Sequence, residues 1–204
     1  MKIVHTEYII RSGAFPSSPT WEQYLDEISK AIRSVVWPPG ATDFRFSDEG
    51  IGRGRGEGNG VVPIKLAFCS QLKEFGWNLE TPLRIASRKN PGKLDATKGS
   101  PDGRLVAVEW ETGNISSSHR ATNKMILGIL KGVLCAGVLV LPTREMYRFL
   151  TDRIGNFEEL SPYFDLWRAI SIHDGLLVVV AVEQDGTTSS APRIPKGTDG
   201  RALS

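Results

Sequence analysis

The sequence predicts one α/β domain in which a central mixed β-sheet is flanked by helices. Segments with the apolar spacing of amphipathic helices alternate along the chain with short runs rich in β-branched residues. The chain has 204 residues, 40% of them hydrophobic, which is enough to bury a large core without disulfides or structural metals. These two observations favour a single layered domain.

The elements follow in chain order. β-Branched residues predict a strand over 2–10, and apolar residues from Trp21 to Val35 at steps of three and four predict a helix. Thr20 and Gln23 have the spacing of a capping box at the start of this helix, and the Pro-Pro-Gly at 38–40 ends it. We also expect a helix over 63–75 and a strand–turn–strand unit over 94–111. The serines at 116–118 could cap a helix that runs to about Gly132. A strand over 138–141, a helix over 143–154 and a strand over 176–182 follow.

Composition excludes several classes. Two cysteines, each in an apolar stretch, argue against a disulfide scaffold or a cysteine-built zinc site and suit the cytoplasm. The start of the chain lacks a secretory signal, and the longest apolar stretch, over 126–141, is interrupted and too short to cross a membrane. The glycine-dense segment 48–60 is not followed by a lysine at P-loop spacing, so we expect no nucleotide cofactor.

Charge is unevenly distributed although the net charge is only +2. Residues 51–100 carry nine Lys or Arg against four Asp or Glu, whereas the first and last quarters are acidic. This basic region could face a polyanion such as a nucleic acid, although solvated lysine-rich surfaces are common. From Gly186 onward small and polar residues dominate, so we expect a domain over 1–185 and a loosely attached tail over 186–204.

Three carboxylates are the candidate catalytic groups. Asp95 lies on the first strand of the strand–turn–strand unit, and Glu109 and Glu111 lie on one face of the second. Adjacent strands lie about 5 Å apart, so carboxylates from both can converge on one cation. Oxygen ligands without Cys or His suit Mg²⁺, which can polarise a phosphodiester. Glu-x-Glu is also common on solvated hairpin edges, so this alternative stays open.

The same residues resemble the active-site hairpin of PD-(D/E)xK nucleases. Asp-x-x-Lys at 95–98, followed after a turn by Arg-Leu-Val-Ala-Val-Glu-Trp-Glu at 104–111, is similar to type II restriction endonucleases of the BglII, BstYI and BamHI group. The similarity extends to a helix and Gly-Trp segment over 62–77 and to a strand ending in Leu-Pro at 141–142. It covers residues 1–183 in order and implies a restriction-endonuclease-like fold.

The resemblance implies roles for single residues. Asp95 would be the bridging Mg²⁺ ligand and Glu109 the second ligand, and both would be catalytic with Glu111. Glu111 occupies the position where most of these enzymes have Lys, as in the BamHI-like variant, and would serve as a base or ligand. Asp102, in the Pro-Asp of the turn, is the alternative to Asp95.

The resemblance also implies that the stretch after Glu111 contacts the DNA major groove. Asn, Arg and Ser can read base edges, although a serine there could simply cap a helix. Further basic residues could position phosphates without specifying sequence. The candidates for DNA contact are Asn114, Ser116, Ser117, Ser118, His119, Arg120 and Lys124, with Arg53, Arg55, Arg84, Arg88, Lys89 and Lys93 as further phosphate contacts.

Together these features predict a Mg²⁺-dependent type II endonuclease that cleaves double-stranded DNA. Its family implies a homodimer, whose two-fold symmetry would match a palindromic site, and 5′-phosphate products. The alternatives are a structure-selective repair nuclease of the same fold, a non-catalytic DNA-binding module, and a small-molecule-binding α/β domain. Neither a membrane nor a nucleotide is an expected partner.

Overall fold

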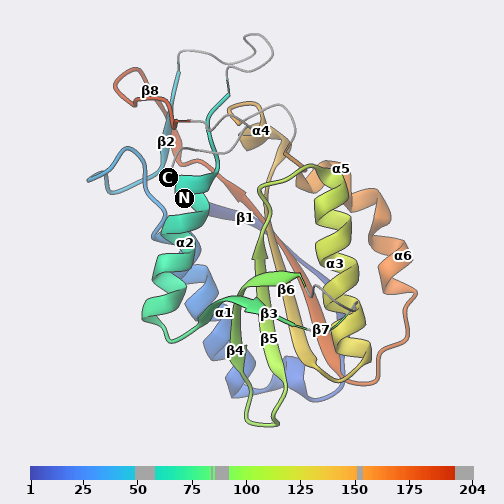
Figure 1. Cartoon of the computed structure of the whole chain (residues 1–204). Coiled ribbons are helices and arrows are strands. Elements are labelled where there is room, and N and C mark those ends of the chain that lie inside the picture. Colours follow the sequence, from blue (N-terminus) through green and yellow to red (C-terminus); the bar gives the residue numbers. More distant parts are fainter. Residues whose placement is uncertain (49–57, 84, 86–91, 151–153, 196–204) are drawn as a thin grey trace.

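A computed structural model describes residues 1–48, 58–83, 85, 92–150 and 154–195. Its centre is a six-stranded mixed sheet in the order β1-β7-β6-β5-β4-β3 (Figure 1). The strands β5, β6 and β7 run parallel to one another, and the remaining neighbours are antiparallel. The predicted central mixed sheet flanked by helices is therefore confirmed. The strand bounds are β1 Lys2–Ser12, β3 Asn78–Pro82, β4 Lys93–Gly99, β5 Leu105–Trp110, β6 Leu134–Pro142 and β7 Gly175–Glu183.

Helices cover both faces of the sheet (Figure 1). On one face, α1 and α2 pack against alternate strand residues such as Val106 and Val108, and on the other, α3 packs against Ala107 and Leu139. This alternation explains why the central strands β6 and β7 are apolar on both faces. The helix bounds are α1 Pro19–Arg33, α2 Val62–Glu74, α3 Ile115–Leu130, α4 Arg144–Tyr147, α5 Phe157–Leu160 and α6 Phe164–Arg168, with 3₁₀ turns η1 Phe15–Ser17 and η2 Ser161–Tyr163.

Several local expectations are corrected. The first helix is capped by Ser18, whose hydroxyl accepts the backbone N–H of Trp21, rather than by Thr20. The helix expected over 143–154 is only the four-residue α4, and residues 151–153 lie outside the described part of the chain. Strand β3 was not predicted; its five residues alternate between partly buried and exposed positions at the edge of the sheet.

The expectation of a loose tail from residue 186 is wrong for residues 186–195. Strand β8 (Gly186–Thr188) pairs with β2 (Arg45–Ser47) in a second, parallel sheet. Ile194 is buried, and its backbone N–H donates to the Asn59 side chain at 2.9 Å. Residues 196–204 lie outside the described part of the chain. Among the described helices, none is long and apolar enough to cross a membrane.

Candidate active site

The predicted catalytic carboxylates lie where β4 and β5 separate. The ladder between these strands ends at the pair Ala96–Val108, and the next positions outward are Asp95 and Glu109. Beyond this pair, the Asp95 side chain takes over from the backbone as hydrogen-bond acceptor: its Oδ2 accepts the backbone N–H of Trp110 at 2.8 Å. Asp95 is only 6% exposed. The carboxylate is thus fixed on rigid backbone, as a catalytic group requires.

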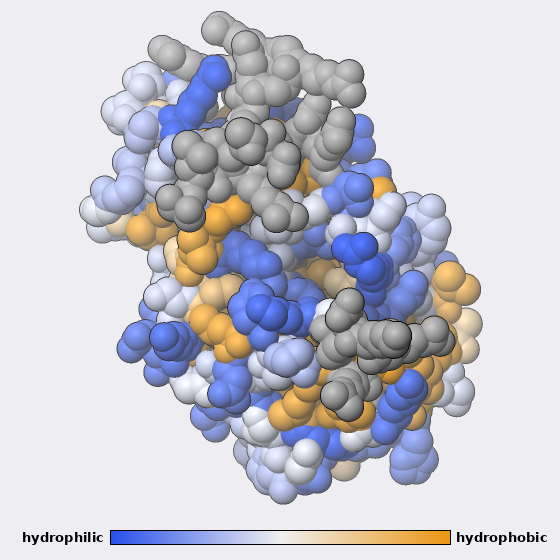
Figure 2. All heavy atoms as spheres, viewed as in Figure 1, coloured by the Kyte–Doolittle hydropathy of each residue, from blue (hydrophilic) through white to orange (hydrophobic). Residues whose placement is uncertain are grey.

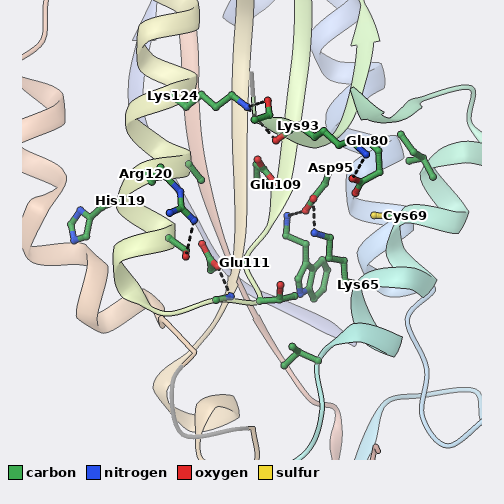
Figure 3. A pocket seen from close by; sticks show the side chains of 18 of the residues that line it. Lys65, Cys69, Glu80, Lys93, Asp95, Glu109, Glu111, His119, Arg120 and Lys124 are labelled. Atoms are coloured by element: carbon green, nitrogen blue, oxygen red, sulfur yellow. Dashed lines mark hydrogen bonds and ion pairs between the residues drawn. The ribbon is translucent and has the colours of Figure 1, made fainter. Parts of the chain in front are cut away.

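Glu109 lies against Asp95 (Figure 3). Burial raises the pKa of Glu109 to about 9, with the charge and contact of the Asp95 carboxylate acting in the same direction, against the opposing charges of Lys65 and Lys124. Two carboxylates this close cannot both be charged without a compensating cation. The burial of Glu109 and the proximity of Asp95 thus favour the protonated form of Glu109, and nearby cations favour its charged form.

Lys65 of α2 reaches the same pair from outside the hairpin. Its Nζ is 2.5 Å from Asp95 Oδ1. Burial alone would lower the pKa of Lys65, but the ion pair with Asp95 and the charge of Glu109 outweigh burial, so the pKa is raised. Lys65 therefore remains an ammonium ion and neutralises Asp95.

Glu111 lies at the end of β5, on the α3 side of the pair (Figure 3). Its Oε1 accepts the backbone N–H of Gly113 at 2.5 Å, and the residue is 7% exposed. Burial raises the pKa of Glu111, and the hydrogen bond from Gly113 partly opposes this shift. The Ser118 side chain acts on the pKa of Glu111 in the same direction as Gly113, so neighbours on the α3 side hold this carboxylate in place.

A cavity of about 1300 Å³ connects these groups. It lies between α2 and α3, where Figure 2 shows hydrophilic side chains gathered on the surface. Asp95, Glu109 and Glu111 line the cavity together with basic side chains from both helices (Figure 3). The structure thus brings together all three predicted catalytic carboxylates in one accessible hollow.

The alternative carboxylate, Asp102, is not among the residues that line this cavity. It lies in the turn between β4 and β5, where it accepts hydrogen bonds from the Arg104 side chain at 2.7 Å and from its backbone at 3.0 Å. Arg104 also pairs with Asp174. Asp102 is therefore part of a structural ion-pair cluster, and the geometry favours Asp95.

The segment predicted to contact DNA forms the start of α3, on the wall of the cavity. Asn114 caps the helix, and its Oδ1 accepts the backbone N–H of Ser117 at 3.2 Å, so the cap is Asn114 rather than a serine. Asn114, Ser116 and Arg120 are exposed. The Arg120 guanidinium donates to the Ser117 hydroxyl at 3.1 Å. Ser116, Ser117 and Arg120 line the cavity, and Asn114 is exposed next to them without lining it.

Ser118 does not belong to this exposed set. It is fully buried, and its hydroxyl packs against Gly155, where an added Cβ would lie 2.7 Å from the oxygen. Ser118 is therefore not exposed to a ligand in this structure, and its contact with DNA stays a prediction. His119 does line the cavity, and its ring is held edge-on by Tyr163 with centroids 4.4 Å apart.

Lys124, one turn further along α3, points into the cavity (Figure 3). Its ammonium group donates to the backbone carbonyls of Gly92 and Lys93. Burial lowers the pKa of Lys124, and the charges of Glu109 and Asp95 oppose this shift. Lys93 also lines the cavity, whereas the other phosphate candidates (Arg53, Arg55, Arg84, Arg88 and Lys89) lie outside the described residues.

Sequence reasoning missed Lys65 and Glu80 as cavity residues. Glu80 lies in β3 with a left-handed φ of 52° and pairs with Lys93 at 3.5 Å. A non-glycine residue with this φ is uncommon and often occurs at functional sites. Nothing in the sequence singled out either residue, because both reach the cavity through tertiary packing.

Comparisons with known proteins identify the family of this chain. The family model "Restriction endonuclease BamHI" matches residues 1–201. The chain is 47% identical to the type II restriction enzyme OkrAI of Oceanobacter kriegii over 203 residues, which cover both chains completely. It is 36% identical to the type II restriction enzyme BamHI of Bacillus amyloliquefaciens over 186 residues, 88% of this chain and 82% of that protein.

A solved structure supports the same fold. The restriction endonuclease BglII, crystallised with a DNA 16-mer, superposes with a TM-score of 0.63 over 91% of this chain and 79% of its own, at 14% sequence identity. At that identity the likeness concerns the fold alone. The full-length family match and the two relatives carry the assignment: this chain belongs to the BamHI family of type II restriction endonucleases.

Proposed function

We propose that this chain is a Mg²⁺-dependent endonuclease that cleaves double-stranded DNA at a short palindromic site and leaves 5′-phosphate ends. The observation that carries the proposal is the contact between Asp95 and Glu109 at the divergence of β4 and β5, inside a cavity lined by lysines. As a member of this family the chain is a site-specific deoxyribonuclease, and the metal, the symmetry of the site and the product ends are the proposed details.

The residues present fit a divalent cation. Within the described residues, no three His, Cys, Asp or Glu side chains form a complete metal site. Mg²⁺ needs only one or two carboxylates, because water and substrate phosphate supply its other ligands. Asp95 and Glu109 would hold the ion. Bound Mg²⁺ supplies Lewis-acid stabilisation of the phosphate charge and makes water more acidic.

Glu111 fits the role of general base. Its Oε1 is held by Gly113, which orients the carboxylate to accept a proton from the attacking water. Burial moves the pKa of Glu111 upward, toward neutral pH, and a general base is most effective when its pKa lies near the working pH. Breaking the bond to the 3′ oxygen leaves the phosphate on the 5′ side.

The two walls of the cavity fit the DNA itself. We propose that Asn114, Ser116, Ser117 and Arg120, at the start of α3, face base edges, and that Lys93 and Lys124 face phosphates. Since each chain has one hydrolytic site, cleavage of both strands calls for a homodimer, whose two-fold axis would match that of a palindrome. The enzyme would meet this DNA in the cytoplasm.

Digestion of unmethylated phage DNA tests the proposal. Purified protein with Mg²⁺ should give discrete fragments, whereas EDTA or the Glu111→Ala variant should leave the DNA intact. Sequencing the fragment ends gives the site and shows whether the 5′ ends carry phosphate. A smear would indicate a structure-selective nuclease, and intact DNA with retained binding would indicate a non-catalytic module; either result would overturn the proposal.

A further inference from the structure

An ammonium group from α2 lies directly against a catalytic carboxylate. Lys65 Nζ is 2.5 Å from Asp95 Oδ1, and the Lys65 side chain is 26% exposed while that of Asp95 is 7% exposed. Figure 3 shows Lys65 reaching toward Asp95 from the side of the cavity opposite α3. The contact therefore joins α2, which lies outside the β4–β5 hairpin, to the carboxylate pair of Asp95 and Glu109.

The hairpin itself lacks a positive charge at this place. Glu109 and Glu111 stand two residues apart on the second strand of the hairpin, and Asp95 stands on the first. A phosphodiester entering the cavity would therefore meet three acidic side chains. A phosphate that develops negative charge during hydrolysis needs donors or cations aimed at its oxygens.

Among the described residues three lysines line the cavity, and of these Lys65 forms an ion pair with Asp95. Lys124 donates to two backbone carbonyls, and Lys93 pairs with Glu80. The base of Lys65 is rigid, since the neighbouring α2 residues Phe68 and Leu72 are fully buried. The flexible four-carbon stem then lets the ammonium group move while the helix stays in place.

We propose that Lys65 supplies from α2 a catalytic ammonium group to the acidic hairpin. In the DNA-free protein this group neutralises Asp95 and competes with a divalent cation for the carboxylate. When DNA is bound, the ammonium moves to a non-bridging oxygen of the scissile phosphate and donates hydrogen bonds to it. This assignment rests on the proposed function.

The Lys65→Gln variant tests both parts, because glutamine keeps a polar side chain beside Asp95 but removes the charge. Single-turnover cleavage at saturating Mg²⁺ should fall by about 100-fold or more, the usual effect of removing one donor to a developing oxyanion. Calorimetric titration of the DNA-free variant with Mn²⁺ should show at least about threefold tighter binding, because one positive charge next to the site is gone. DNA affinity measured in Ca²⁺ should fall by a much smaller factor than the cleavage rate, because Lys65 is one of several basic side chains that line the cavity.

Lys73→Gln is the matched control, since Lys73 is an exposed residue on the same helix and does not line the cavity. It should match the wild type in all three measurements. A folded Lys65→Gln protein that cleaves within about threefold of the wild type would overturn the catalytic role, and unchanged Mn²⁺ affinity would overturn the competition. If Lys65→Gln does not fold, Lys65→Met provides the same neutral comparison. Wild-type protein that leaves phage DNA intact would instead refute the proposed function.

Discussion

Replacing Lys98 with methionine should destabilise the protein without touching the hydrolytic site. Lys98 follows Asp95 by three residues, but its ammonium group contacts α1, where it donates to both oxygens of Glu27 at 2.8 and 3.0 Å. It also donates to the carbonyl of Phe75 at 2.7 Å and lies 5.0 Å from the centre of the Tyr24 ring. The side chain thus joins α1, β4 and the end of α2.

The expected loss follows from burial. The Lys98 side chain is 19% exposed and the Glu27 side chain 12% exposed. After the substitution Glu27 keeps hydrogen bonds from Trp77 and Gln23, both at 2.8 Å, but no opposite charge. Removing one partner of a buried ion pair costs about 3–5 kcal/mol. Because two donors to Glu27 remain, we expect about 3 kcal/mol, a decrease in Tm of about 6–12 °C for a chain of this size.

Urea unfolding monitored by circular dichroism measures the free energy of unfolding. The control is Lys30→Met. Lys30 pairs with Asp26 on the surface of α1, the helix that carries Glu27, and both side chains are more than half exposed. Such a pair contributes about 0.3–0.5 kcal/mol. The double variant Glu27→Gln/Lys98→Met removes both charges and should recover part of the loss.

The pair also predicts a pH dependence. Burial alone would raise the pKa of Glu27, but hydrogen bonds from Lys98, Gln23 and Trp77 outweigh burial and lower it. A lowered carboxyl pKa stabilises the fold above the ordinary pKa, and the stabilisation is lost as pH falls through the folded-state value. A Lys98→Met protein within about 1 kcal/mol of the wild type at pH 7 would refute the reasoning that the pair is buried and coupled.

Three further predictions concern the cavity. In EDTA, the raised pKa of Glu109 (about 9) should make the free energy of unfolding fall as pH rises from 5 toward 9. Urea titrations should show a flatter pH dependence for Glu109→Gln. Equal slopes in the wild type and the variant would contradict the raised pKa. Asn114→Asp should leave the free energy of unfolding unchanged, because Asp caps a helix as well as Asn, but it should weaken DNA binding in a fluorescence-anisotropy titration. Asn114→Ala should weaken DNA binding and also lower the free energy of unfolding by about 1 kcal/mol. Gly155→Ala should lower the free energy of unfolding by about 1–3 kcal/mol, since the added Cβ would lie 2.7 Å from the Ser118 hydroxyl. The control is Gly99→Ala, whose Cβ would meet no atom within 4 Å. Equal losses for the two variants would refute the packing argument.

The fold could be predicted where apolar periodicity is strong. Strands β1 and β7 and helices α1, α2 and α3 lie within a few residues of their predicted positions, because each buries a continuous apolar face or run. Edge strand β3 has no buried residue, and the helices α5 and α6 span only four and five residues, which is too short for a periodic apolar signal. The packing of residues 186–195 depends on pairing between β8 and β2, which are far apart in sequence.

The residues of the candidate site also differ in whether the sequence could predict them. Asp95, Glu109 and Glu111 could be predicted because strand alternation and one turn bring them together locally. Lys65 and Glu80 could not, since α2 and the irregular β3 meet the hairpin only in the folded protein. The burial of Ser118 could not be predicted either, because it depends on the packing of α3 against Gly155.

The most direct test of the hydrolytic assignment compares two matched substitutions, Asp95→Asn and Asp102→Asn. Single-turnover cleavage of a DNA duplex carrying the site identified from phage DNA is measured for both, together with DNA affinity in Ca²⁺. The account predicts that Asp95→Asn abolishes cleavage while retaining DNA binding, and that Asp102→Asn cleaves like the wild type. Cleavage by Asp95→Asn, or its loss in a folded Asp102→Asn protein, would contradict the account.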